Sequence, residues 1–145
     1  MQNLQRHFLL LFFLGIIGCN NGNNEATEDN PPDPGENWLK HLSVEDASKL
    51  LEQDPKPTIL DIRRDFEFQA GNIEGAVSLD FYNEAFKEEL DKHDKDQPIL
   101  VHCASGGRST ESLKHFKSLG FQDVYHLDGG FKAWQAAGLP VEQQN

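Results

Sequence analysis

The chain has 145 residues, 37% of them hydrophobic, and 24 acidic against 13 basic residues give it a net charge of −11. This length is enough for one domain with a substantial core. The acidic balance argues against a nucleic-acid partner, and it means that an anionic substrate needs a local positive site.

The first 18 residues have the composition of an export signal. Arg6 supplies a positive charge, and the ten residues from Phe8 to Ile17 form an apolar run. A membrane-spanning helix needs about 20 residues, so this run fits the apolar part of a signal peptide instead. Gly18-Cys19 at its end resembles a bacterial lipobox, which implies cleavage before Cys19 and lipidation of Cys19. An ordinary signal peptide with a chance cysteine is the alternative.

Residues 20–37 contain five acidic and no basic residues, with almost nothing apolar, so we expect a disordered tether. The expected organisation is therefore a signal peptide over residues 1–18, a lipidated cysteine and tether over 19–37, and one folded domain over 38–145. Acyl chains on Cys19 would anchor this domain to a membrane of the bacterial cell envelope, on the periplasmic or outer face.

The folded domain alternates between helix and strand patterns. Ser43, with Asp46 three residues later, is the expected N-cap of the first helix. The predicted elements in chain order are a helix over 42–54, strands over 57–63 and 76–79, a helix over 83–93, a strand over 98–102, a helix over 109–120 capped by Ser109 or Thr110, a strand over 123–127 and a short helix over 129–137. This alternation predicts an α/β fold with a parallel sheet covered by helices on both faces.

Cys103 directly follows the predicted strand over 98–102, at an edge where parallel sheets place their ligands. Backbone N–H groups at the start of the next helix favour negative charge there and should lower the pKa of the thiol. Gly106 and Gly107 permit positive φ, which lets successive N–H groups form an anion-binding nest, and Arg108 adds a fork of donors. We predict Cys103 as the nucleophile and Ala104, Ser105, Gly106, Gly107 and Arg108 as the substrate-binding loop.

Two chemistries fit such a loop, because a thiolate can attack either a phosphate ester or the outer sulfur of an anion such as thiosulfate. The alternative without catalytic function is a buried, inert cysteine before an ordinary glycine turn. A zinc site is disfavoured, because Cys103 has no neighbours at metal-ligand spacing.

Three segments, in this order, resemble the rhodanese family: LDIRRDFEFQAGNIEGA (60–76), VHCASGGRS (101–109) and LDGGFKAWQAAGLPV (127–141). The resemblance implies a three-layer α/β/α fold with a mostly parallel central sheet of about five strands. It also implies a thiosulfate sulfurtransferase-like enzyme without a cofactor. Asn72 stands after a turn glycine, where the family usually has histidine.

Loop length separates the two chemistries. Counted from Cys103, Arg108 is the sixth residue, whereas the arginine of cysteine phosphatases is the seventh. Among rhodanese-like domains the six-residue loop accompanies sulfur substrates, so the resemblance favours sulfur transfer through a Cys103 persulfide. The acceptor would be a thiol, cyanide or a thioredoxin-like protein. A sulfur-carrier or redox module that serves a protein partner stays open, as does, less favoured, a cysteine phosphatase or arsenate reductase-like enzyme.

The remaining candidate residues have supporting roles. We expect Asp61 and Arg63 to form an ion pair or to support the loop, and Ser109 to support it from the helix. His102 and His126 are expected to be structural, and the sequence gives no sign of more than a monomer. Phe131 and Trp134 are assigned to the core.

Overall fold

The computed structural model describes residues 34–143, so the predicted signal peptide, Cys19 and most of the predicted tether lie outside the described residues. Five parallel strands form one sheet in the order β1-β5-β4-β2-β3. The strands are β1 (Leu39–Leu42), β2 (Thr58–Asp61), β3 (Val77–Ser78), β4 (Ile99–His102) and β5 (Val124–Leu127). The predicted α/β fold with a parallel sheet is confirmed.

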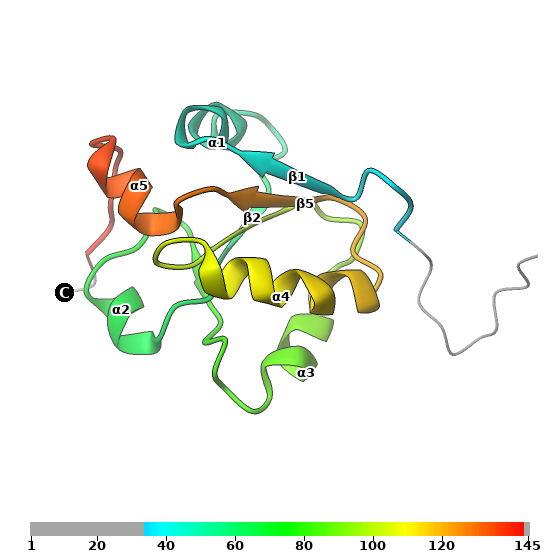
Figure 1. The fold of residues 1–145 in the computed structure, drawn as a ribbon. Helices are drawn as coiled ribbons and strands as arrows, with labels where there is room; N and C mark the ends of the chain where they lie inside the picture. Colours follow the sequence, from blue (N-terminus) through cyan, green and yellow to red (C-terminus); the bar gives the residue numbers. More distant parts are fainter. Residues whose placement is uncertain (1–33, 144–145) are drawn as a thin grey trace, which may run out of the picture.

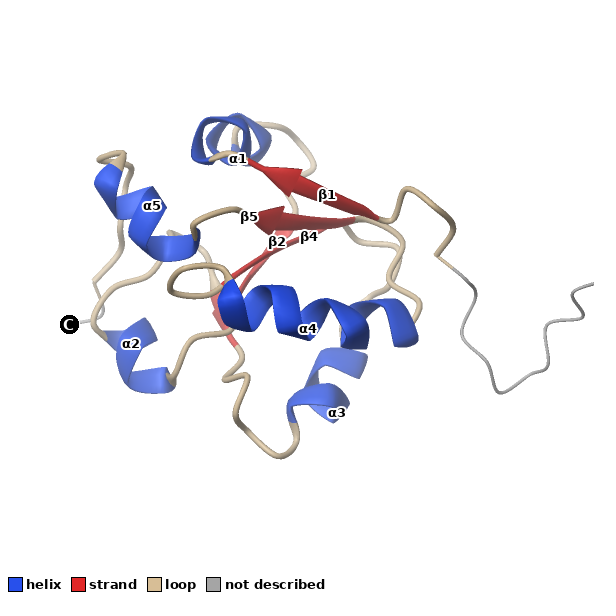
Figure 2. Cartoon of the chain, viewed as in Figure 1, coloured by secondary structure: helices blue, strands red, loops and turns tan. Residues whose placement is uncertain are grey.

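Helices cover both faces of this sheet (Figure 1, Figure 2). They are α1 (Val44–Leu51), α2 (Asp65–Gln69), α3 (Phe86–Asp91), α4 (Gly107–Ser118) and α5 (Gly130–Ala136). The apolar side chains of α1 and α5 pack on one face of the sheet, and those of α3 and α4 pack on the other. The result is three layers, as the resemblance implied.

Alternation along the strands decides which face each side chain reaches. In β4, Ile99 and Val101 point towards α3 and α4, whereas Leu100 points towards α1 and α5. In β5, Val124 faces α4, and Leu127 faces α5. The same alternation continues past β4 and puts Cys103 into the layer of α4.

Two elements were not predicted from the sequence. β1 is a short edge strand with two exposed residues, and only its parallel pairing with β5 defines it. α2 has five residues and is closed at its start by the Glu67 side chain, which accepts a hydrogen bond from the Arg64 N–H at 3.0 Å. Neither element is long enough to show a hydrophobic period.

The N-cap of the first helix was predicted correctly, whereas the predicted cap of α4, Ser109 or Thr110, was wrong. The first helix begins at Val44, directly after the expected N-cap Ser43, and Leu42 belongs to β1. The hydroxyl of Ser43 accepts from the Asp46 N–H at 3.2 Å, as the capping motif predicted. α4 begins at Gly107 with Gly106 as its N-cap, so Ser109 lies in the first turn and does not cap it.

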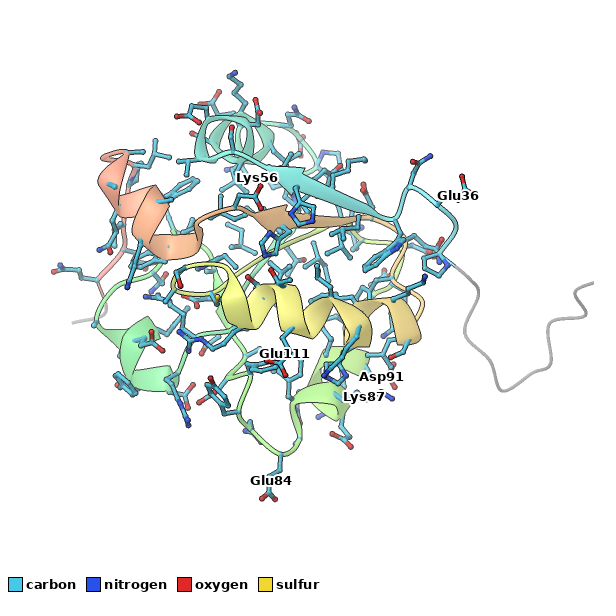
Figure 3. All side chains as sticks on the ribbon, in the orientation of Figure 1. Glu36, Lys56, Glu84, Lys87, Asp91 and Glu111 are labelled. Carbon is cyan, nitrogen blue, oxygen red and sulfur yellow. The ribbon has the colours of Figure 1, made fainter. Side chains whose placement is uncertain are left out.

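The surface is charged: Lys56, Lys87 and Glu111 are exposed, and Glu36 and Glu84 project away from the core in Figure 3. Within residues 34–143, every helix is too short or too polar to span a bilayer.

Phe116 should be one of the strongest single supports of the α4 layer. It is fully buried, and its ring meets that of Phe121 edge to face at a centroid distance of 5.1 Å. We predict that Phe116→Ala lowers the free energy of unfolding by about 3–5 kcal/mol through lost burial and a residual cavity. Urea unfolding measures this. Phe66→Ala is the matched control, because Phe66 is 71% exposed, and an equal loss in both variants would contradict the assignment.

Candidate active site

Cys103 lies at the carboxyl end of β4 and is only 1% exposed. The chain turns back over its sulfur at Gly106, whose φ of 101° is in the left-handed region that favours glycine. This turn brings the Gly106 N–H to 3.2 Å from Cys103 Sγ and the Ser109 hydroxyl to 3.5 Å from it. The loop therefore curls around the sulfur, as the predicted anion nest requires.

Two opposing effects act on the thiol. Burial by itself raises the pKa of Cys103, but hydrogen bonds from the Ser109 hydroxyl and from the backbone N–H groups of Ser109, Ser105 and Gly106 outweigh it. The net pKa lies below the ordinary value of a cysteine, which favours the thiolate. The prediction that the loop stabilises a thiolate thus gains a geometric basis, and the interpretation as an inert cysteine loses support.

The start of α5 holds the outer side of this loop. The N–H groups of Phe131 and Lys132 donate to the carbonyl oxygens of Cys103 and Ala104 at 2.8 and 3.0 Å. Such close approach needs a glycine, because a Cβ on Gly130 would lie 2.5 Å from the Cys103 carbonyl oxygen. With these carbonyls engaged by α5, the loop N–H groups remain available to the sulfur.

Arg108 forms a two-pronged ion pair with Glu67 of α2. Its Nη1 and Nη2 donate to the two carboxylate oxygens at 2.7 and 3.0 Å. Hydrogen bonds from Arg108 hold the pKa of Glu67 below its ordinary value, despite partial burial. The carboxylate fixes the guanidinium, and two of its five N–H donors are occupied. The charge of Cys103 is among the causes that raise the pKa of Arg108, after the hydrogen bond to Glu67.

Asp61 and Arg63 form a buried ion pair on the face of α5. Arg63 Nε and Nη2 donate to the Asp61 carboxylate at 2.5–2.9 Å, and Nη2 also donates to the Gly71 carbonyl at 2.7 Å. The guanidinium stacks on the Phe131 ring, 3.8 Å from its centroid. The expected ion pair is therefore present, and its contact with Phe131 places it against the start of α5.

His102 lies on that same face, so its side chain points away from the layer that contains Cys103. It is fully buried, it stacks on Phe131 at a centroid distance of 6.1 Å, and burial lowers its pKa, which keeps it neutral. It is thus a buried residue of β4, as expected from the sequence. Asn72 is buried beside this region, and its backbone pairs with that of Glu142 at 2.8 and 2.9 Å.

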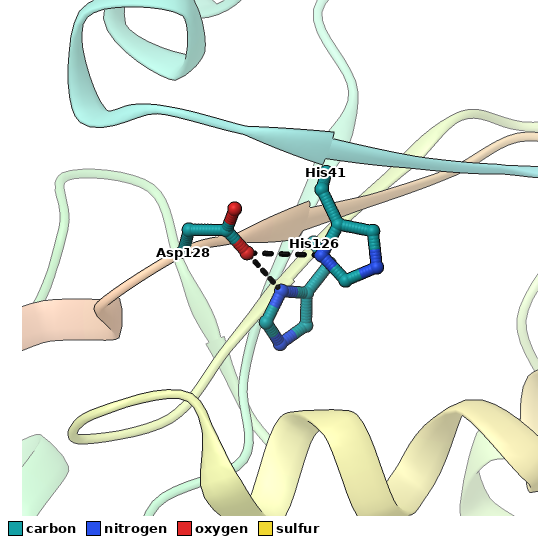
Figure 4. A group of neighbouring side chains, drawn as sticks. All are labelled: His41, His126 and Asp128. Carbon is teal, nitrogen blue, oxygen red and sulfur yellow. Dashed lines mark hydrogen bonds and ion pairs between the residues drawn. The ribbon is translucent and has the colours of Figure 1, made fainter.

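His126 projects from β5 towards α4. Its Nε2 lies 2.9 Å from Ser109 Oγ, and its Nδ1 lies 2.9 Å from Asp128 Oδ1. The same carboxylate oxygen lies 2.9 Å from Nδ1 of His41 on β1 (Figure 4). Within residues 34–143, these three side chains are the one group whose possible ligand atoms lie close enough together to hold a metal ion, within 4.8 Å of one another. Because Asp128 Oδ1 accepts from both rings, we interpret the group as a hydrogen-bonded cluster and not as a metal centre.

A pocket of about 320 Å³ opens beside the loop. Its lining includes Arg63, Phe66, Glu67, Ala104 and Lys132. A larger hollow of about 740 Å³ lies between α1, the start of β2 and the Leu139-Pro140 segment, and no residue of the loop lines it. The smaller pocket therefore has the better position for a substrate that reaches Cys103.

Comparison with known proteins decides the family. The family model described as the rhodanese-like domain matches residues 43–137. The thiosulfate sulfurtransferase GlpE of Vibrio cholerae is 34% identical over 102 residues, which cover 70% of this chain and 93% of that protein. GlpE of Shewanella oneidensis is 39% identical over 99 residues, which cover 68% and 95%. The chain belongs to the rhodanese family.

A solved structure supports the fold as well. The Alr3790 protein from Anabaena superposes with a TM-score of 0.63 at 29% identity, covering 70% of this chain and 81% of that chain. The expectation of a sulfurtransferase-type enzyme is confirmed by the relatives, whose printed name is thiosulfate sulfurtransferase.

The predicted site residues of this rhodanese divide into two groups. The loop from Cys103 to Ser109 lies on the face of α4, with Gly106 and Ser109 in contact with the sulfur. Asp61 and Arg63 lie on the other face, where Arg63 contacts Phe131 of α5. Sequence reasoning missed Glu67 as the partner of Arg108, and it did not connect His126 with Ser109. The alternation of side chains along β5 could have indicated the contact between His126 and Ser109, since it places His126 on the same face of the sheet as Val124.

Gly130 offers a direct test of the contact between α5 and the rhodanese loop. We predict that Gly130→Ala strongly lowers both the free energy of unfolding and the rate at which iodoacetamide alkylates Cys103, because the methyl group would overlap the loop backbone. Gly138→Ala is the matched control: its φ of 70° is also left-handed, but its Cβ would meet open space. The control should lose only about 1–2 kcal/mol of stability. Similar stability and alkylation in both variants would contradict this role of the glycine.

Proposed function

We propose that this rhodanese transfers a sulfane sulfur from thiosulfate, or a similar small anion, to a thiol or cyanide through a persulfide on Cys103. The observation that carries the proposal is the convergence of loop N–H groups on the Cys103 sulfur, with a lowered pKa of the thiol despite burial. The names of the relatives support the choice of thiosulfate as the donor class.

In the first step the Cys103 thiolate attacks the outer sulfur of the donor. A new S–S bond forms to Cys103, the S–S bond of thiosulfate breaks, and its electron pair leaves with sulfite. The loop N–H groups that stabilise the thiolate would then stabilise the outer sulfur of the persulfide, which is also an anion. No external oxidant or reductant is needed.

In the second step a nucleophile attacks the outer sulfur of the persulfide. The bond between that sulfur and Cys103 breaks, and the electron pair returns to Cys103 as a thiolate. This is a two-step reaction with a covalent enzyme intermediate, for which ping-pong kinetics are the expected signature.

Positive groups near the pocket would bind the donor. Arg108 keeps three N–H donors beyond those that contact Glu67, and the exposed Lys132 lines the pocket next to Ala104. Because residues 38–145 contain 12 basic and 19 acidic residues, such local donors matter for a dianion approaching an acidic surface.

Phosphoryl transfer is less well supported as the reaction. Arg108 comes one residue earlier than in the cysteine phosphatase signature.

A sulfur-carrier role towards a protein thiol is the second candidate. Phe66 is 71% exposed and lines the pocket beside Ala104, and an apolar ring at this rim suits a protein surface better than a small anion. This candidate shares the Cys103 persulfide with the first and differs only in the acceptor.

Thiocyanate formation from thiosulfate and cyanide tests the function. We expect turnover by the full chain and none above background by Cys103→Ser, because only the thiol can form the persulfide. Hydrolysis of an aryl phosphate is measured alongside. Phosphate release without thiocyanate, lost in the same variant, would contradict sulfur transfer and favour the phosphatase interpretation.

We also propose that the protein is exported and anchored in the cell envelope through lipid on Cys19. The support is the lipobox-like end of the apolar run in the sequence. Membrane fractionation tests this: Cys19→Ala should move the protein from the membrane fraction to the soluble fraction. Cys103→Ser is the matched control and should stay with the membrane. Unchanged membrane retention of Cys19→Ala would contradict the anchor.

A further inference from the structure

A continuous chain of polar contacts connects Cys103 with the protein surface. Ser109 Oγ lies 3.5 Å from Cys103 Sγ and 2.9 Å from His126 Nε2, and His126 Nδ1 lies 2.9 Å from Asp128 Oδ1. Cys103 and Ser109 are buried and His126 is 3% exposed, whereas the Asp128 side chain is 56% exposed. Figure 4 shows the outer end of this chain, where Asp128 lies between the rings of His126 and His41.

The contacts fix which atoms carry protons. An ionised carboxylate only accepts hydrogen bonds, and bonds with His41 and then His126 hold the pKa of Asp128 below its ordinary value despite some burial. His126 therefore carries its proton on Nδ1, and in the neutral ring Nε2 is a bare acceptor that faces Ser109. The neutral ring of His126 can therefore take up a proton only at Nε2, from the side of Ser109.

Ser109 has one hydroxyl proton and three partners for it: Cys103 Sγ, the Gly106 carbonyl at 3.0 Å and His126 Nε2. Opposite a neutral His126, the shortest of these contacts directs the proton to Nε2. Opposite a protonated His126, the ring N–H donates to Ser109 Oγ instead, and the hydroxyl proton is free to stabilise the sulfur. The protonation of His126 and the charge on Cys103 are therefore coupled through Ser109.

We propose that Ser109, His126 and Asp128 form a proton relay that deprotonates Cys103. The S–H bond breaks as its proton passes to Ser109 Oγ, while the Ser109 proton passes to His126 Nε2. The electron pair remains on sulfur, so the product is a thiolate facing an imidazolium, and nothing is oxidised or reduced. His126 is a positioning residue in this scheme, since it acts on Cys103 only through Ser109.

The burial of Cys103 explains why a relay is useful. A thiol that is 1% exposed has little direct contact with water, but the Asp128 side chain at the other end of the relay is 56% exposed. The titratable groups that face His126 are His41 on β1, Asp128 after β5 and, through Ser109, Cys103; α4 adds the hydroxyls of Ser109 and Thr110. Asp128 compensates the positive charge that the relay places on His126.

The relay rests on the proposed role of Cys103 as nucleophile, but it can be tested without sulfur transfer. The measurement is the rate of Cys103 alkylation by iodoacetamide against pH, with the full chain and with Cys103 quantified by peptide mass spectrometry so that Cys19 does not interfere. In His126→Gln we expect the midpoint to move to higher pH and the rate below the wild-type midpoint to fall about tenfold, which corresponds to one pKa unit. The rates should converge at high pH.

His41→Gln is the matched control, because His41 makes the same contact with Asp128 at 2.9 Å and the structure gives it no bond to Ser109. Its alkylation profile should match the wild type. An unchanged profile in His126→Gln would overturn the relay, and so would equal shifts in both variants, which would indicate a general loss of surface charge. A shifted profile in a protein that makes no thiocyanate would support the relay while rejecting the proposed function.

A second measurement covers the case in which His126→Gln does not fold. The coupling is reciprocal, so removing the thiolate must make His126 harder to protonate. NMR titration of the His126 ring nitrogens in Cys103→Ala should therefore give a midpoint at lower pH than in the wild type. Identical titration of His126 in the two proteins would overturn the relay.

Discussion

The hydrogen bonds from the start of α5 to the carbonyls of Cys103 and Ala104 are the constraint on which the site depends. A short loop has as many carbonyls as N–H groups, and a nest for an anion needs the carbonyls to be engaged elsewhere. The N–H groups of Phe131 and Lys132 engage two of them, and Gly130 allows the necessary approach. The far end of the domain thus determines the conformation of a loop almost thirty residues earlier.

The alternation of the strands divides the polar residues of the active edge into two sets. On the face of α5, Asp61 and Arg63 form a buried pair that packs against Phe131, and breaking such a pair typically costs about 3–5 kcal/mol. On the face of α4, Ser109 lies between Cys103 and His126 and contacts both. One set supports the loop from behind, and the other is placed to act on the sulfur. Adjacent residues such as His102 and Cys103 therefore have unrelated roles.

Much of the fold was predictable from the sequence, because the four predicted helices alternate with the four predicted strands, and this alternation indicates a parallel α/β sheet. The nucleophile was predictable too, since Cys103 follows a buried strand and precedes a helix. Glu67 and His126 were not assigned to the site, because both act through tertiary contacts: Glu67 reaches Arg108 across 41 residues, and His126 reaches Ser109 across 17. Arg108 was predicted as an anion-binding residue, but two of its N–H donors bind Glu67, so fewer are available to an anion than the sequence indicated.

The anion-stabilising groups at the sulfur are backbone N–H groups and the Ser109 hydroxyl, because Arg108 is already paired with Glu67. The most direct test is peptide mass spectrometry of Cys103 after incubation with thiosulfate and without reductant. We expect an added mass of one sulfur atom on Cys103, which cyanide removes. An unchanged mass of Cys103, or an adduct that retains the sulfite group, would contradict a loop built to hold a persulfide.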